Sequence, residues 1–296
     1  MSLIQVLQNQ AITLAFACGL IGVVVGSFLN VVIHRLPKML ERDWDCQAAD
    51  LLEQRKMPDV AKKLRTPGAS RYNLMTPAST CPHCGHKIKA HENIPIVSYI
   101  FLQGRCSSCK APISIRYPIV EAASGIFAAY IGWRFGLTLV MAGALIFMWA
   151  LLALTAIDID TQLLPDDITL PLVWLGLLVN LNNGFTQLSS AVIGAVAGYL
   201  SLWTVYWLFK LATGKEGMGY GDFKLLSAIG AWLGWKMLPI VILLSSLVGA
   251  IVGIALILFA RHSRSTPIPF GPYLAAAGLI ALFWGDIINR TYLQLF

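Results

Sequence analysis

Eight long apolar runs dominate the sequence and restrict it to folds that place them in a membrane. A helix needs about 20 mostly apolar residues to cross the hydrocarbon core of a bilayer. Only 12% of the residues are charged, against about 25% in a soluble domain, and the mean hydropathy is +0.68. We therefore expect an all-α polytopic membrane protein with about eight transmembrane helices. The runs are residues 11–33, 117–135, 138–157, 168–182, 187–209, 223–235, 237–260 and 270–288.

The first run is expected to remain in the mature protein as a membrane helix. Residues 1–10 contain no Lys or Arg, so the basic segment that opens a cleavable signal peptide is missing. Pro37 follows the run and is expected to end the helix. His34 and Arg35 then lie at its cytoplasmic end, where they are expected to anchor it at the membrane interface.

The division of the chain follows from its one long polar stretch. Residues 1–37 form the first transmembrane segment in this scheme. Residues 38–116 form a polar domain, and residues 117–296 form a transmembrane core. Leu51 opens a mixed-charge stretch in the polar domain that could be a short surface helix or a flexible arm.

The basic residues predict the orientation, because Lys and Arg concentrate on cytoplasmic loops. If all eight runs span, 19 of the 22 Lys and Arg residues fall on one side, 14 of them between Arg35 and Arg116. That side should be cytoplasmic, which places the amino terminus outside. Asp158 and Asp222 then share the cytoplasmic face with the polar domain. Because this topology accounts for the net charge of +7, no nucleic-acid partner is expected.

Four of the six cysteines form two pairs with zinc-site spacing. Cys81-Pro-His-Cys84 and Cys106-Ser-Ser-Cys109 are separated by 21 residues, and a two-residue gap lets both thiolates of a pair reach one tetrahedral ion. A reducing cytoplasmic loop disfavours disulfides. Four thiolates leave no open coordination position, so we expect structural zinc. Redox-active dithiols and unliganded thiols are the alternatives.

The other residues near this motif are expected to have plainer roles. Gly85 and Lys110 suit the tight turns that follow each cysteine pair. Nearby histidines are expected to be solvated, and Cys18 is expected to pack within the first helix. Cys46 is assigned no role. The histidines are His83, His86 and His91.

Two carboxylates at the ends of apolar runs are the candidate catalytic pair. Asp158 follows a long run directly, and Asp222 ends the sequence Gly219-Tyr220-Gly221-Asp222. Ionisable groups at membrane depth are costly and point to function. Of the acids near Asp158, Asp166 and Asp167 are expected to begin and cap the next helix.

Two neighbouring carboxyl groups can perform aspartic-protease chemistry. The charged one draws a proton from water while the protonated one donates to the peptide carbonyl oxygen. Neither a Gly-x-Ser-x-Gly nor a His-Glu-x-x-His pattern offers another hydrolytic mechanism. Two different classes of function remain open at this point. One is a transporter or channel that uses the acids as ion ligands, and the other is a zinc-dependent binding scaffold.

The combined motifs resemble the bacterial type IV prepilin peptidases, members of the Gly-x-Gly-Asp aspartic proteases. The resemblance covers nearly the whole chain. It rests on the segment from Gly26 to Pro37, on Cys81–Cys109 with the stretches Asn93–Tyr99 and Arg116–Glu121, on Ala156–Asp166, on Gly219–Lys224 and on Pro269–Pro272.

The resemblance implies an inner-membrane enzyme with two activities. Such enzymes cut a short basic leader from prepilins and pseudopilins of type IV pilus and type II secretion systems, and then methylate the new amino terminus with S-adenosylmethionine. The catalytic pair falls on Asp158 and Asp222, and the metal ligands fall on Cys81, Cys84, Cys106 and Cys109.

The methyltransferase activity rests on the resemblance alone. The sequence has no Gly-rich nucleotide fingerprint, so it identifies no cofactor-binding residue. The cytoplasmic domain is the natural host for this activity, and Glu121 is a candidate residue.

Overall fold

The computed structural model describes residues 10–64, 72–259 and 268–293. Within these residues all regular secondary structure is helical, apart from two isolated β-bridges. The chain divides into two compact units. One comprises residues 17–129, and the other comprises residues 130–296 with residues 1–16.

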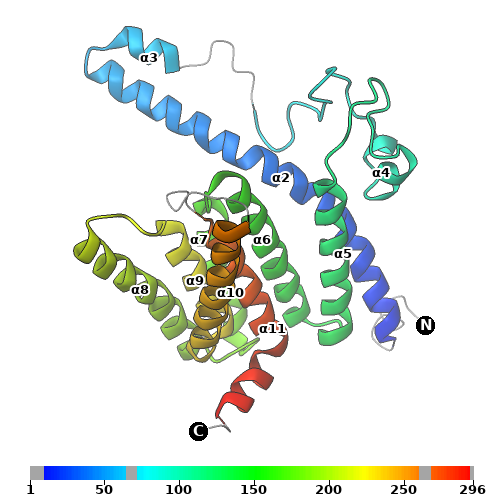
Figure 1. Cartoon of the computed structure of the whole chain (residues 1–296). Helices are drawn as coiled ribbons and strands as arrows, with labels where there is room; N and C mark the ends of the chain where they lie inside the picture. The colour runs from blue at the N-terminus through cyan, green and yellow to red at the C-terminus, as the bar shows by residue number, and fades with distance from the viewer. Residues whose placement is uncertain (1–9, 65–71, 260–267, 294–296) are drawn as a thin grey trace. The chain divides into compact units, whose positions relative to one another are not determined.

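Each of the eight predicted apolar runs forms a helix (Figure 1). Three shorter α- or 3₁₀-helices, α3 (Pro58–Leu64), η1 (Ala90–Asn93) and α4 (Val97–Phe101), lie in the polar domain. The eight long helices are α2 (Ala11–Gln54), α5 (Arg116–Phe135), α6 (Leu139–Thr161), α7 (Asp166–Val179), α8 (Leu188–Thr213), α9 (Tyr220–Leu233), α10 (Leu238–Phe259) and α11 (Gly271–Leu293).

Five helices among the described residues are long and apolar enough to cross a membrane. They are α2, α6, α8, the segment Trp235–Leu256 and α11. This finding supports the predicted all-α membrane protein. With 14 residues each, α7 and α9 are only about 21 Å long at 1.5 Å per residue. Eight complete crossings therefore remain a prediction.

The first helix does not end at Pro37, so that prediction is wrong. α2 continues through Pro37 to Gln54 and has 44 residues. Proline removes one backbone donor and normally disfavours a helix interior. Here Pro37 and its neighbours Ile33 and Leu36 are buried, and their packing holds the helical path. The mixed-charge stretch that starts at Leu51 belongs to the end of this helix.

Arg35 is not an interface anchor, which corrects a second prediction for this region. Its side chain is buried and its guanidinium donates to the backbone oxygens of Asn73, Leu74 and Pro77. Five N–H donors in a fixed fork suit such multiple contacts. Arg35 therefore fastens the loop at residues 73–77 to α2, while His34 stays exposed.

Close packing of α2 on α5 depends on small residues. A Cβ atom added to Gly22 would lie 2.6 Å from the Cβ of Ala128, and one added to Gly26 would lie 2.8 Å from the Cα of Glu121. The Ser124 hydroxyl also donates to the Gly22 carbonyl. Small residues spaced four apart are a common means of bringing membrane helices together.

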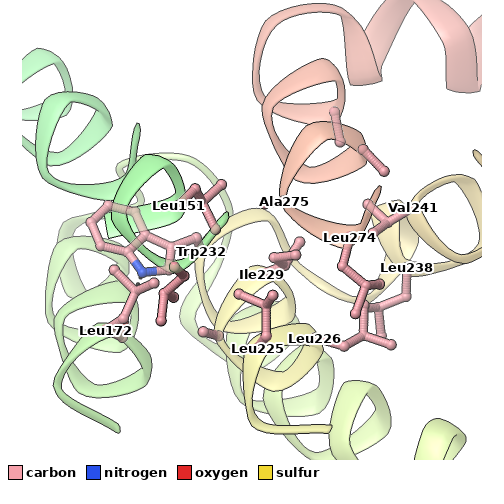
Figure 2. Close-up of a cluster of buried hydrophobic side chains, with 14 of the residues drawn as sticks. Leu151, Leu172, Leu225, Leu226, Ile229, Trp232, Leu238, Val241, Leu274 and Ala275 are labelled. Atoms are coloured by element: carbon pink, nitrogen blue, oxygen red, sulfur yellow. Dashed lines mark hydrogen bonds between the residues drawn. The ribbon is translucent and has the colours of Figure 1, made fainter. Parts of the chain in front are cut away.

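The core of the second unit is built around α9 (Figure 2). Leu225, Leu226, Ile229 and Trp232 of this helix are fully buried. The Trp232 indole N–H donates to the Leu172 carbonyl of α7 at 2.7 Å, as a buried indole requires. A helix that is buried on all sides belongs to the core of a protein. Packing against its neighbours therefore stabilises α9, although the helix is short.

Candidate active site and metal centre

Asp158 lies in the last turn of α6 and is held by the start of α11. Its side chain is 4% exposed, and its Oδ2 atom accepts a hydrogen bond from the backbone N–H of Gly271 at 3.0 Å. Gly271 is the first residue of α11. The first N–H groups of a helix have no partner within the helix and favour an anion, so α11 fixes this carboxylate.

Asp222 occupies the first turn of α9 and is 7% exposed. Its Oδ1 atom is the only buried side-chain oxygen or nitrogen without a hydrogen-bond partner in the part of the chain that the structure describes. A buried polar atom normally has a partner. This oxygen is therefore available to a water molecule or a substrate group.

The two carboxyl groups belong to one site. Asp158 lies close enough to Asp222 for the two carboxyl groups to interact electrostatically. Leu164, in the connection after α6, links their surroundings, because it lies against both Gly221 and Gly271. A Cβ atom added to Gly221 would lie 2.7 Å from the Leu164 Cβ. Glycine at both positions lets three chain segments meet around the aspartates.

The other acids near Asp158 have different positions. Asp166 contacts the Lys224 ammonium with both carboxylate oxygens at 2.7 Å, which joins the starts of α7 and α9. Asp160 is exposed. α7 begins with Asp166 and Asp167, as predicted, but the predicted side-chain cap does not form. The capping position is Pro165, which has no side-chain acceptor.

The four predicted metal ligands lie together in the unit of residues 17–129. The Sγ atoms of Cys81, Cys84, Cys106 and Cys109 are all within 4.8 Å of one another. The Cys81 and Cys109 sulfurs are 3.8 Å apart. Tetrahedral zinc with bonds of about 2.3 Å separates its sulfurs by about 3.8 Å, so the cluster fits a four-thiolate ion.

Each cysteine pair lies on a tight turn of the same design. The Cys81 N–H bonds to the His86 carbonyl, and the Cys106 N–H bonds to the Ala111 carbonyl. An isolated antiparallel bridge flanks each turn. Gly85 has φ +71° and Lys110 has φ +59°, as the expected turns require. Backbone N–H groups of Cys84 and His83 lower the pKa of the Cys81 thiol to about 7, which favours the metal-binding thiolate.

Glu92 connects the two turns. Its carboxylate accepts from the Lys89 N–H at 2.9 Å and contacts His86 at 3.1 Å, and it bonds to the Ser107 hydroxyl of the second turn. The Lys89 N–H, Ser107 and His86, in that order of effect, lower the Glu92 pKa from 4.5 to about 2. His86 is thus part of this network and not a solvated loop histidine, whereas His83 and His91 are exposed.

The structure adds contributors that sequence reasoning missed. Leu164 and Glu92 lie within the motif segments Ala156–Asp166 and Cys81–Cys109, but no local pattern indicates their roles, because these arise from contacts across the fold. The role of Gly271 has a partial signal, since Gly271-Pro272 before an apolar run is typical of a helix start. Cys18 is buried as predicted, and Cys46 is exposed.

Comparison with known proteins accounts for most of the chain. Residues 20–135 match the bacterial peptidase A24 N-terminal domain, and residues 145–254 match the type IV leader peptidase family. A prepilin leader peptidase/N-methyltransferase of Pseudomonas aeruginosa is 54% identical over 99% of this chain and 98% of its own length. Proteins of the same name from Stutzerimonas stutzeri and Aeromonas hydrophila are 52% and 57% identical, over 99% and 94% of this chain and 99% and 93% of their own lengths.

No solved structure matches the chain. The two family matches and the near-complete coverage of these relatives nevertheless agree with the resemblance inferred from the motifs. The chain therefore belongs to the type IV leader peptidase family.

Proposed function

We propose that this protein is a prepilin leader peptidase and N-methyltransferase of the bacterial inner membrane. It removes the leader of type IV prepilins and pseudopilins and methylates the amino terminus that cleavage creates. The observation that carries the peptidase assignment is the meeting of Asp158 and Asp222 around Gly271 and Leu164. The transporter alternative is not favoured, because relatives named as peptidases cover nearly the whole chain.

The peptidase uses Asp158 and Asp222 as its acid and base. Two neighbouring carboxylates repel each other when both are charged. The pair therefore tends to keep one proton, so that one group is protonated while the other is ionised. The ionised group takes a proton from the attacking water, and the protonated group donates to the carbonyl oxygen of the scissile peptide and then to the leaving amine. The unpartnered Oδ1 of Asp222 supports a site for the water or carbonyl oxygen.

The four cysteines bind zinc that folds the polar domain. Their sulfur spacing supports this proposal, as does the pairing of two equivalent turns. Zinc bound by four thiolates has no open position for substrate. When bound, the ion links the two cysteine turns to each other. The proposed peptidase reaction uses the two aspartates and needs no metal.

The domain scheme of residues 1–37, 38–116 and 117–296 remains part of the proposal. The amino terminus lies outside, and the zinc domain and the aspartates lie at the cytoplasmic face. Eight helices cross or enter the membrane, with α7 and α9 as the short members. The charge distribution supports this topology.

The proposed function is tested with purified full-length protein in detergent. A prepilin with its leader is incubated with and without S-adenosylmethionine, and mass spectrometry reads the new amino terminus. We expect leader removal in both reactions and an added methyl group only with the donor. An intact leader would refute the peptidase assignment, and a cleaved but unmethylated product in both reactions would refute the methyltransferase assignment.

A further inference from the structure

A large cavity lies within the unit of residues 17–129, next to the cysteine cluster. Its volume is about 520 Å³, within the range of about 300–1,000 Å³ that is usual for small-molecule sites. Polar and aromatic side chains come from α2, from the segment of residues 72–114 that contains α4, and from α5. They include Ser27, Arg35, Tyr72, Tyr99, Tyr117 and Glu121.

The wall of this cavity contains a buried carboxylate. Glu121 is 7% exposed, and its Oε2 atom accepts from the Ile96 N–H at 2.7 Å. Ser27 supplies a second, neutral hydrogen bond. Within the described residues, the salt bridges do not include Glu121. A buried charge without an opposite charge is costly, so a cationic ligand in the cavity would compensate it.

Arg35 does not supply the missing charge. Its guanidinium is directed to three backbone carbonyls of the loop at residues 73–77. The same loop is held a second time, because the Arg42 guanidinium lies 4.1 Å from the ring centre of Tyr72. The two arginines thus fix one wall of the cavity in place. Of the two carboxylates that line the cavity, Glu92 already contacts His86, whereas the hydrogen-bond partners of Glu121 are the neutral Ile96 N–H and Ser27.

The lining suits an organic cation. Tyr99 and Tyr117 line the same cavity as Glu121, and aromatic faces with a carboxylate are the groups that bind onium cations. Tyr72 is not counted among them, because its ring already lies against the Arg42 guanidinium. The methyl donor of the proposed function is a sulfonium cation with a flat base and an amino-acid tail. These residues therefore fit it in charge and in size.

We propose that this cavity is the methyl-donor site, and that Glu121 with Tyr99 and Tyr117 binds the sulfonium group of S-adenosylmethionine. This inference rests on the proposed function and assigns its second activity to a place. The substrate amine first loses a proton to water. Its lone pair then attacks the methyl carbon, and the carbon–sulfur bond breaks with its electrons remaining on sulfur. The products are a methylated ammonium and a neutral thioether, so charge and atoms balance.

The test measures binding and does not depend on turnover. S-adenosylmethionine and S-adenosylhomocysteine, which differ by the methyl group and the positive charge, are titrated into the full-length protein in detergent by calorimetry. Glu121→Gln removes the charge and keeps an acceptor for the Ile96 N–H. We expect it to weaken S-adenosylmethionine binding about ten- to a hundredfold, as loss of a charged contact does, and to leave S-adenosylhomocysteine binding nearly unchanged.

Two further variants separate the charge effect from misfolding. Glu41→Gln makes the same substitution at an exposed position of α2 and should leave both affinities unchanged. Metal content and the unfolding temperature report whether Glu121→Gln folds. If it does not, Tyr117→Leu is used, since it removes an aromatic face but keeps apolar volume, and it too should selectively weaken binding of the cation.

Failure of the proposed site can be told apart from failure of the proposed methyltransferase activity. Unchanged S-adenosylmethionine affinity in Glu121→Gln, or an equal loss for both ligands, would overturn the site while leaving the methyltransferase assignment in place. Wild-type protein that binds neither ligand and adds no methyl group would instead refute the methyltransferase assignment itself. A selective loss for the cation supports the proposal.

Discussion

The backbone N–H of Gly271 donates to the Oδ2 atom of Asp158 at 3.0 Å, across 113 residues of sequence. This bond places one carboxylate of the proposed pair at the first turn of α11. The orientation of Asp158 therefore depends on a segment far away in the chain, and each contributor can be tested separately.

Gly271→Ala should impair catalysis while the helices remain folded. The added Cβ would lie 2.6 Å from Asp158 Oδ2, so the carboxylate must move. A displacement of about 1 Å in a catalytic group costs about a hundredfold in rate, and we expect a loss of leader cleavage of that order. The control is Gly253→Ala in α10, where the added Cβ would lie 3.4 Å from the Cδ1 atom of Ile268, an ordinary contact. Wild-type cleavage by Gly271→Ala would show that the bond to Asp158 is not needed for activity.

Trp232→Ala should strongly destabilise the unit that holds the aspartates. The ring is fully buried, packs 5.0 Å from the Phe147 ring centre and donates to the Leu172 carbonyl. Losing a buried Trp costs about 3–5 kcal/mol, measured by denaturant titration in detergent. Trp174→Ala in α7, where the side chain is 66% exposed, should change stability by about 0.5 kcal/mol or less. Equal effects of the two changes would argue against α9 as the core.

Glu92→Gln should lower the thermal stability of the polar domain in a pH-dependent way. The folded domain lowers the Glu92 pKa from 4.5 to about 2, chiefly through the Lys89 N–H. Its stabilisation is therefore complete above about pH 4.5 and is lost as the pH falls through about 2. We expect the difference in unfolding temperature between wild type and variant to be largest near pH 7 and to shrink below pH 4.5. A difference that grows with acid would have the wrong sign.

Zinc removal should unfold the polar domain before the transmembrane core. Few other core residues lie around the four clustered cysteines. The folding of the polar domain should therefore depend on the bound ion. Cys81→Ser and treatment with a chelator should each reduce bound zinc, measured by elemental analysis, and increase proteolysis within residues 72–116. Cys46→Ser, at an exposed cysteine outside the cluster, is the control. Full zinc retention in Cys81→Ser would exclude it as a ligand.

The sequence predicts local features of the fold better than its long-range contacts. Apolar runs locate all eight long helices, because their spacing is a property of each segment alone. The prediction that α2 ends at Pro37 is wrong. Burial of Pro37 and its neighbours there outweighs the backbone hydrogen bond that a proline cannot donate. Arg35 was mispredicted for a related reason, because its partners are carbonyls about 40 residues away.

The candidate site divides in the same way. Cysteine spacing predicts the cluster, and the turns at Gly85 and Lys110 follow from local geometry. The contacts of Gly271 and Leu164 with the aspartates could not be predicted, because no pattern within either segment specifies them. The cavity around Glu121 also requires three distant segments to meet, so only the structure indicates it.

In the proposed mechanism, Asp158 and Asp222 form one catalytic pair. The most direct measurement is leader cleavage by full-length Asp158→Asn and Asp222→Asn, each with metal content and unfolding temperature matched to wild type. Each single change should abolish cleavage, while a peptide that already lacks its leader should still be methylated. Cleavage at a wild-type rate by either folded variant would show that the changed aspartate is not part of the catalytic pair.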